Sequence, residues 1–253
     1  MRRRRLLAGL GTTIAVGVAG CGAPQAADES IPDREWIDGD ELVADAIAEN
    51  HLSTLITAGS FELVASVETS HDGAREPRSW LPSQTYLSRF DLDQEREYLR
   101  QEMTHGMETD VFELYADGST VYIRQQDGED VSTSHGRRER TTAAFREAME
   151  TEAGSGVRGL SGWNMRITDP TVTWNGESAL RFEADEFIED AGIPESVTDS
   201  VATMYATPNG VVPHLAQLWD GRHGGQTVTV DMEQSFQGIG ETRISEPAWV
   251  SDI

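Results

Sequence analysis

Lysine is absent from this chain of 253 residues, and cysteine occurs only once. All 20 basic residues are therefore arginines, and 44 aspartates and glutamates outnumber them to give a formal net charge of −24. A surface this acidic excludes nucleic-acid binding, which requires a basic face. The single cysteine excludes an intrachain disulfide. Because the acidic residues are spread along the whole sequence, they do not form an acidic tail for a basic partner.

The first twenty residues have the pattern of a signal peptide. Four arginines precede an apolar stretch, rich in glycine and alanine, at residues 6–20. This stretch is shorter than the roughly 20 residues that a membrane-spanning helix requires, so we expect it to be removed. The run from Arg3 to Leu7 resembles the twin-arginine consensus, with Leu6 where phenylalanine is commoner. The resemblance implies export of a chain that has already folded.

The only cysteine comes directly after this segment. Val18, Ala19, Gly20 and Cys21 resemble the lipobox of bacterial and archaeal lipoproteins, in which the thiol receives a diacylglyceryl-type group. The resemblance implies cleavage before Cys21 and a lipid anchor on the extracellular face of the cell membrane. Two acyl chains hold a protein on a membrane durably, whereas one does so only marginally. The alternative is an uncleaved transmembrane anchor with an inert, buried thiol.

The sequence divides into three parts. Residues 1–20 are the expected twin-arginine-type signal peptide, and residues 21–39 are small, polar and proline-containing, as in a lipid-anchored tether. Trp36 and Ile37 within the tether are apolar enough to dock on the adjoining domain. Residues 40–253 lack a break rich in proline and glycine, and they are numerous enough for one globular domain with its own core.

Helical spacing of apolar residues predicts two main helices. The first begins with Asp40 as N-cap and ends at Gly59, and the second covers residues 141–152, opened by threonines and closed by Gly154. A short helix is expected near residues 195–200. The glycine-rich stretch 154–162 is expected to be a flexible linker, because no lysine comes after it as in a phosphate-binding loop.

The remaining sequence alternates apolar and polar residues with a period of two, as in half-buried strands. Asp117-Gly118 and Asn175-Gly176 are hairpin signals between such runs. Because hairpins dominate, we expect an α+β fold with a mainly antiparallel sheet. The expected strands are 61–67, 85–90, 97–103, 111–115, 120–124, 164–173, 179–183, 201–206, 211–219, 226–236 and 242–244.

The order of lipobox, tether, helix, strands, helix and further hairpins resembles acidic haloarchaeal lipoproteins of undescribed function. More remotely, it resembles the lipoprotein-carrier and mycobacterial lipid-transport lipoprotein fold. That fold implies a curved sheet, or half-barrel, with two or three helices packed on its concave side over a cavity for acyl chains. The acidic, lysine-free composition resembles proteins of salt-loving archaea, which implies that molar salt is needed to screen the charge.

Residue patterns for catalysis or metal binding are missing. No two of the six histidines have the His-Glu-x-x-His spacing of zinc enzymes, and residues 91–95 lack the glycine and terminal glutamate of a calcium loop. We therefore expect no enzyme, no cofactor and no metal. Apolar residues on the expected strands are instead the candidates for a ligand cavity, and they are Phe61, Leu63, Val121, Ile123, Met204, Tyr205, Leu215 and Trp219.

These features predict an extracellular, membrane-anchored lipoprotein that binds or carries a lipophilic ligand. One alternative keeps the same apolar residues as a filled core, which any half-buried sheet needs. The protein is then a non-enzymatic module that binds a protein partner at the cell surface. A hydrolase of unknown substrate is the third hypothesis, since 44 acidic residues leave room for a catalytic carboxylate pair, although no pair stands out in the sequence.

Overall fold

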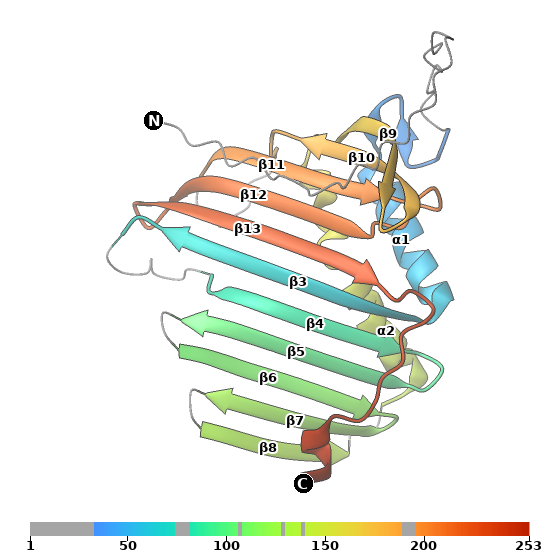
Figure 1. Cartoon of the computed structure of the whole chain (residues 1–253), viewed down its shortest axis with the longest axis vertical. Coiled ribbons are helices and arrows are strands. Elements are labelled where there is room, and N and C mark those ends of the chain that lie inside the picture. Colours follow the sequence, from blue (N-terminus) through green and yellow to red (C-terminus); the bar gives the residue numbers. More distant parts are fainter. Residues whose placement is uncertain are drawn as a thin grey trace, which may run out of the picture.

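The structure, a computed structural model, describes residues 33–73, 81–105, 108–127, 130–137, 140–188 and 196–252. The expected signal peptide, Cys21 and the tether up to residue 32 lie outside these ranges. The described chain forms one antiparallel sheet of 13 strands with helices packed on one face (Figure 1). The α+β class with a curved antiparallel sheet, expected from the sequence, is confirmed.

Two meanders make up the sheet. Its centre is the pairing of β13 (Gln226–Gln237) with β3 (Ser60–His71), which runs from Val228 opposite His71 to Gln237 opposite Glu62. On one side of β3 lie β4 (Ser83–Asp91), β5 (Arg96–His105), β6 (Glu108–Asp117), β7 (Thr120–Asp127) and β8 (Asp130–Arg137). On the other side of β13 lie β12 (His214–His223), β11 (Ser196–Ala206), β10 (Glu177–Ala184), β9 (Arg166–Trp174), β2 (Glu41–Leu42) and β1 (Ile37–Asp38).

Both α-helices lie on the same face of the sheet. Helix α1 (Ala44–Ala58) ends at Gly59, whose φ of 74° is left-handed and whose N–H donates to the carbonyls of Leu55 and Ile56. Helix α2 (Thr142–Ala153) begins after Thr141, whose hydroxyl accepts a hydrogen bond from the Ala144 N–H at 3.1 Å. Within the described residues, neither helix has the length and apolar character needed to cross a membrane.

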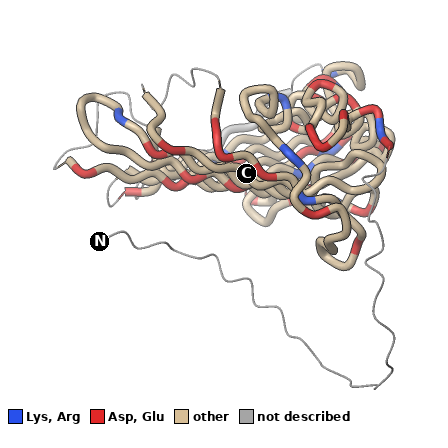
Figure 2. Tube along the Cα trace, turned by 90° about the horizontal axis from the view of Figure 1, so that it is seen from above, with Lys and Arg blue, Asp and Glu red and all other residues tan. Residues whose placement is uncertain are grey.

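The main core lies between the helices and the face of the sheet that they cover. We call this face the helix face and the opposite one the outer face. Phe61 and Leu63 of β3 alternate with Glu62 and Val64, so the first pair is buried at 0% and 1% exposure while Val64 on the outer face is 41% exposed. The helices contribute apolar side chains to the same cluster, namely Ile47 and Leu55 of α1 and Phe145, Met149 and Ala153 of α2. Figure 2 shows acidic residues spread along the sheet and around the parts of the chain that cover it.

A smaller cluster lies on the outer face. Tyr115 of β6 packs there with Ile244 and Val250, which belong to the segment after β13 and to the 3-10 helix η2 (Ala248–Asp252). This C-terminal segment crosses the outer face near the ends of β3 to β7 (Figure 1). Residues 242–244, expected to be a strand, are irregular there, so that prediction was wrong.

Three further predictions need correction. Asp40 is not an N-cap, because β2 intervenes and the helix starts at Ala44 behind Val43, which makes no side-chain cap. Ser196 to Ser200 form the start of β11 rather than a helix, since they pair with β12. The glycine-rich stretch is no linker, because it contains a 3-10 helix, η1 (Val157–Gly162), with Val157 and Leu160 buried in the core.

Two further features concern the residues at the end of the expected tether and one additional strand. Trp36 is 3% exposed in the main core and Ile37 belongs to β1, so the packed part of the chain begins within the last residues of the expected tether. Strand β8 was not expected. Its sequence is rich in serine and lacks a clear apolar alternation, and pairing with β7 defines it instead.

Candidate functional site

Three apolar side chains form a row on the helix face of β5 to β7. Leu99 pairs with Leu114, and Leu114 pairs with Ile123. Directly paired residues point to the same face, and Leu99 connects through Ser88 to the core residue Leu63. Met103 and Phe112 lie beside the row on the same face. We call these five residues the apolar row.

The apolar row is not part of either core. All five residues are half-buried, and none of them belongs to the main cluster or to the outer-face cluster of packed apolar side chains. Helix α2 packs on the neighbouring strand β4, where Phe145 contacts Phe90 at 5.7 Å between ring centroids. Figure 1 shows α2 behind β4 and β5, and none of the described helices lies behind β6 to β8.

The outer face of the same strands carries an ionic cluster next to the small apolar cluster of Tyr115. Glu113 of β6, 3% exposed, accepts hydrogen bonds from the Tyr98 hydroxyl at 2.7 Å and from Arg124 at 2.8 Å, and it lies 3.2 Å from Arg100. Burial and the neighbouring Glu113 raise the pKa of Tyr98 to about 12, so its hydroxyl stays a donor. Strands β5 to β7 are thus amphipathic, with an ionic outer side and an apolar helix side.

A polar group borders the apolar row beneath α2. Glu97 of β5 forms an ion pair with Arg140, and both side chains are almost completely buried. The Arg140 guanidinium also lies 4.7 Å above the Phe145 ring. Close by, Tyr86 and Glu152 are hydrogen-bonded, and burial raises the pKa of both groups. These contacts hold α2 on β4 and β5. They lie at the edge of the apolar row.

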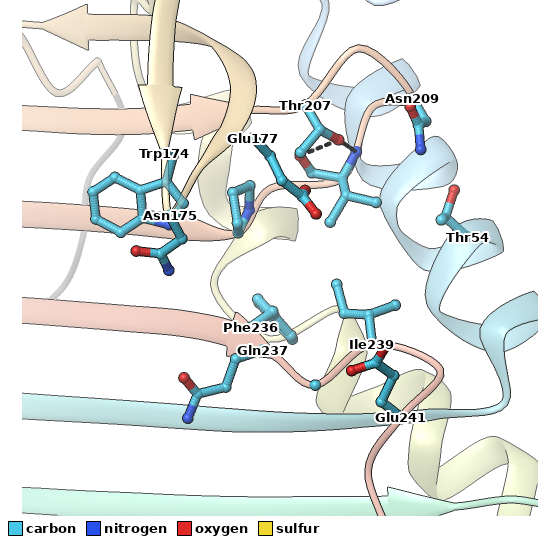
Figure 3. A pocket seen from close by; sticks show the side chains of 13 residues that line it. Thr54, Trp174, Asn175, Glu177, Thr207, Asn209, Phe236, Gln237, Ile239 and Glu241 are labelled. Atoms are coloured by element: carbon cyan, nitrogen blue, oxygen red, sulfur yellow. Dashed lines mark hydrogen bonds between the residues drawn. The ribbon is translucent and has the colours of Figure 1, made fainter.

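A pocket of about 410 Å³ lies at a different place, beside the second half of α1 (Figure 3). Its floor is apolar and its rim carries hydroxyls, amides and carboxylates. The lining residues are Thr54, Trp174, Asn175, Glu177, Thr207, Asn209, Val211, Pro213, Phe236, Gln237, Gly238, Ile239 and Glu241. They come from α1, the β9–β10 turn, the loop between β11 and β12, and the chain that leaves β13.

The loop between β11 and β12 is fixed on both sides. Within it, the Thr207 N–H donates to the Val211 carbonyl at 2.8 Å, and the Val211 N–H donates to the Thr207 hydroxyl at 3.1 Å. Towards α1, the Val212 N–H donates to Nδ1 of His51 at 3.1 Å. Burial lowers the pKa of His51 to about 4, so the imidazole is neutral at neutral pH and its nitrogen can accept this bond.

Aromatic stacking fixes the β9–β10 turn. The Trp174 ring lies 4.4 Å from Tyr205 and 4.5 Å from His214, between ring centroids. Nδ1 of His214 lies 3.0 Å from the Ser235 hydroxyl, and burial lowers the pKa of this histidine. The turn residues Asn175 and Glu177, which come after Trp174, are therefore held at the rim of the pocket.

The structure separates the eight predicted cavity residues into three groups. Five belong to the main core, and these are Phe61, Leu63, Met204, Leu215 and Trp219. Val121 and Ile123 lie on the helix face of β7, where Ile123 is part of the apolar row. Tyr205 points to the outer face, because it alternates with the core residue Met204. The thirteen pocket residues include none of the eight, and a ligand-lining role stays a prediction.

Sequence reasoning missed most of the apolar row. Leu99 and Met103 lie in the expected strand 97–103, and Phe112 and Leu114 lie in 111–115, so the signal was present. What the sequence did not supply was the register that places Leu99, Leu114 and Ile123 in one line. The pocket has no signal of this kind, because its lining comes from four separated segments.

A family model described as "Family of unknown function (DUF7537)" matches residues 6–253. The chain belongs to the DUF7537 family. No curated protein sequence matches this DUF7537 member. Among solved structures, it is similar to the crystal structure of the LolA superfamily protein NE2245 from Nitrosomonas europaea, with 8% identity and a TM-score of 0.20. That match covers 80% of the DUF7537 chain and 94% of the NE2245 chain.

Proposed function

We propose that this protein binds a lipophilic molecule, such as an acyl chain, on the apolar row of β5 to β7. The observation that carries the proposal is the amphipathic character of these strands. Their outer side is covered by ion pairs around Glu113, whereas Leu99, Leu114 and Ile123 on the other side pack against neither core. Apolar surface that a globular domain leaves outside its core marks an interaction site.

We further propose that the chain acts at the extracellular face of a cell membrane, without catalysis. The signal-peptide pattern, the twin-arginine resemblance and the lipobox at Cys21 support this location. The lysine-free acidic composition supports a salt-rich environment of the kind that haloarchaea inhabit. A Cys21→Ser chain expressed in such a host should leave the membrane fraction and appear in the medium, and retention in the membrane would contradict the lipid anchor.

Ligand uptake tests the proposal. The mature chain with Cys21→Ser, purified in molar salt, should enhance the emission of a fluorescent fatty acid in a saturable manner. Leu114→Gln should reduce that binding strongly, because it places an amide in the middle of the apolar row. Val64→Gln is the matched control, since Val64 is an exposed apolar residue of the outer face. Saturable binding that both variants retain equally would overturn the proposal.

The second candidate function is a surface module that covers the apolar row with a protein partner. The burial of the main core favours it, because Phe61, Leu63, Met204 and Leu215 are at most 1% exposed and pack in one cluster. A pull-down from membranes in molar salt distinguishes the two functions. One stoichiometric protein that is retained by wild type and lost with Leu114→Gln, without fatty-acid uptake, would select this candidate.

A further inference from the structure

The pocket beside α1 is a second site, separate from the apolar row. Its thirteen lining residues come from α1, from the β9–β10 turn and from residues 207–213 and 236–241, so none lies on β5 to β7. Its volume of about 410 Å³ is within the range of small-molecule sites. A ligand there does not compete with one on the apolar row.

The pocket is built on fixed supports. The loop wall is bonded to His51 of α1, and the turn is held by the stack of Trp174 on Tyr205 and His214. On the third side, the Gly240 N–H donates to the Ser60 carbonyl at 2.8 Å, and the Thr242 hydroxyl donates to the Gly238 carbonyl at 2.8 Å. Such supports keep the space open without a ligand, which lowers the cost of binding.

The floor and the rim differ in chemistry. Val211, Pro213 and Phe236 are buried and Ile239 is half-buried, and these four side chains supply the apolar floor. At the rim, Figure 3 shows Glu177 and Glu241 on opposite sides of the space. No ion pair joins either carboxylate to another side chain of the described ranges, and none of the thirteen lining residues is an arginine or a histidine.

We propose that this pocket binds a small organic cation that carries alkyl groups on its ammonium nitrogen. The apolar floor receives the alkyl groups, and the two carboxylates attract the charge from opposite sides. The amides of Asn175 and Asn209 offer further polar contacts at the rim, whereas the Gln237 amide donates to Glu62. An anion is repelled by Glu177 and Glu241, and a neutral molecule lacks the charge–charge attraction to them.

Choline and its uncharged carbon isostere, 3,3-dimethylbutan-1-ol, form a matched pair of probes. Calorimetric titration of the mature chain in molar sodium chloride should show saturable choline binding that is at least about fivefold tighter than binding of the alcohol. Equal affinity for the two probes would overturn the proposal, because the carboxylates would then play no part. The absence of any saturable choline binding would overturn it as well.

Two charge-neutralising variants locate the site. Glu177→Gln and Glu241→Gln should each weaken choline binding by roughly fivefold, since each removes one charge and keeps the shape. Glu186→Gln is the matched control, because Glu186 is exposed and does not line the pocket. An equal loss in all three variants would reject the pocket as the site. Fatty-acid uptake measured on the same variants should stay at the wild-type level, so the two proposals succeed or fail independently.

Discussion

The backbone N–H of Val212 donates a hydrogen bond to Nδ1 of His51, 3.1 Å away, and this bond joins the loop before β12 to helix α1. His51 is completely buried, and its ring meets Phe236 edge-on at 4.6 Å between centroids. A protonated imidazole has no nitrogen left to accept the Val212 N–H. The contact between helix and loop therefore depends on a neutral histidine.

This dependence predicts a loss of stability in mild acid. The folded chain binds the His51 proton only near pH 4, whereas the unfolded chain binds it near pH 6.5. The stabilisation is thus complete above pH 6.5 and decreases towards pH 4, with about 2 kcal/mol lost between pH 7 and pH 5. The raised pKa of Glu152 acts with the opposite sign, because the folded chain then binds that proton more readily.

Urea unfolding in molar salt at pH 7 and pH 5 measures the effect. The difference in unfolding free energy between the two pH values should be smaller in His51→Asn than in wild type, by about the same 2 kcal/mol. His105→Asn, at an exposed position, should keep the wild-type difference. A His51→Asn chain with an unaltered pH dependence would show that another group is responsible.

The ion pair under α2 is buried, so we expect its loss to cost more stability than the loss of an exposed ion pair. Arg140→Ala should lower the unfolding free energy by about 3 kcal/mol, because it leaves the buried Glu97 carboxylate without its partner. Arg181→Ala is the control, since the Arg181–Glu183 pair is largely solvated and should contribute less than about 1 kcal/mol. Chemical denaturation of both variants compares the two pairs. Equal, small losses would mean that water reaches Glu97.

Alanine substitutions at two glycines with open surroundings distinguish the cost of a strained backbone from the cost of steric crowding. A Cβ atom added at Gly59 or at Gly159 meets no atom within 4 Å, but only Gly59 has a left-handed φ, of 74°. Gly59→Ala should therefore destabilise the chain by about 1 kcal/mol, whereas Gly159→Ala should be neutral or slightly stabilising. Thermal melting of both variants tests this. A melting temperature lowered equally by both would contradict a conformational origin.

The excess of acidic residues predicts stability that rises with salt. The chain has a net charge of −24, so its acidic side chains repel one another. Salt shortens the distance over which this repulsion acts, from ~30 Å at 0.01 M to ~3 Å at 1 M. The melting temperature should therefore increase between dilute and molar sodium chloride. Sodium chloride and a matched concentration of sucrose separate screening from general stabilisation of the compact state. A melting curve that does not change with salt would refute the prediction.

Local signals in the sequence were sufficient for most of the sheet. The alternation around Phe61 and the turns at Gly118 and Gly176 predicted hairpins that the structure contains. Helix α2 was correct to within one residue at both ends, because the Thr141 hydroxyl caps its first turn and Gly154 comes directly after its last residue. The start of α1 was not, since Asp40 resembles a cap but the residues after it pair with β9. Tertiary pairing outweighed the local preference there.

The candidate sites depended on information that a single strand does not carry. Leu215 and Ile123 have the same apolar alternation, yet one is in the filled core and the other in the apolar row. The difference is whether a helix lies above them. The position of α2 is determined by long-range contacts such as Arg140 with Glu97, and neither residue type nor spacing indicates that pair in advance.

The pairing of β3 with β13 also determines when the sheet can be completed during folding. Leu63 of β3 finds its neighbour Phe236 of β13 only after all the strands from β4 to β12 have been made. Until then the first meander presents the bare edge of β3, which is open to unwanted pairing with other chains. Closure of the sheet is therefore a late event in the synthesis of the described chain, because it waits until β13 has left the ribosome.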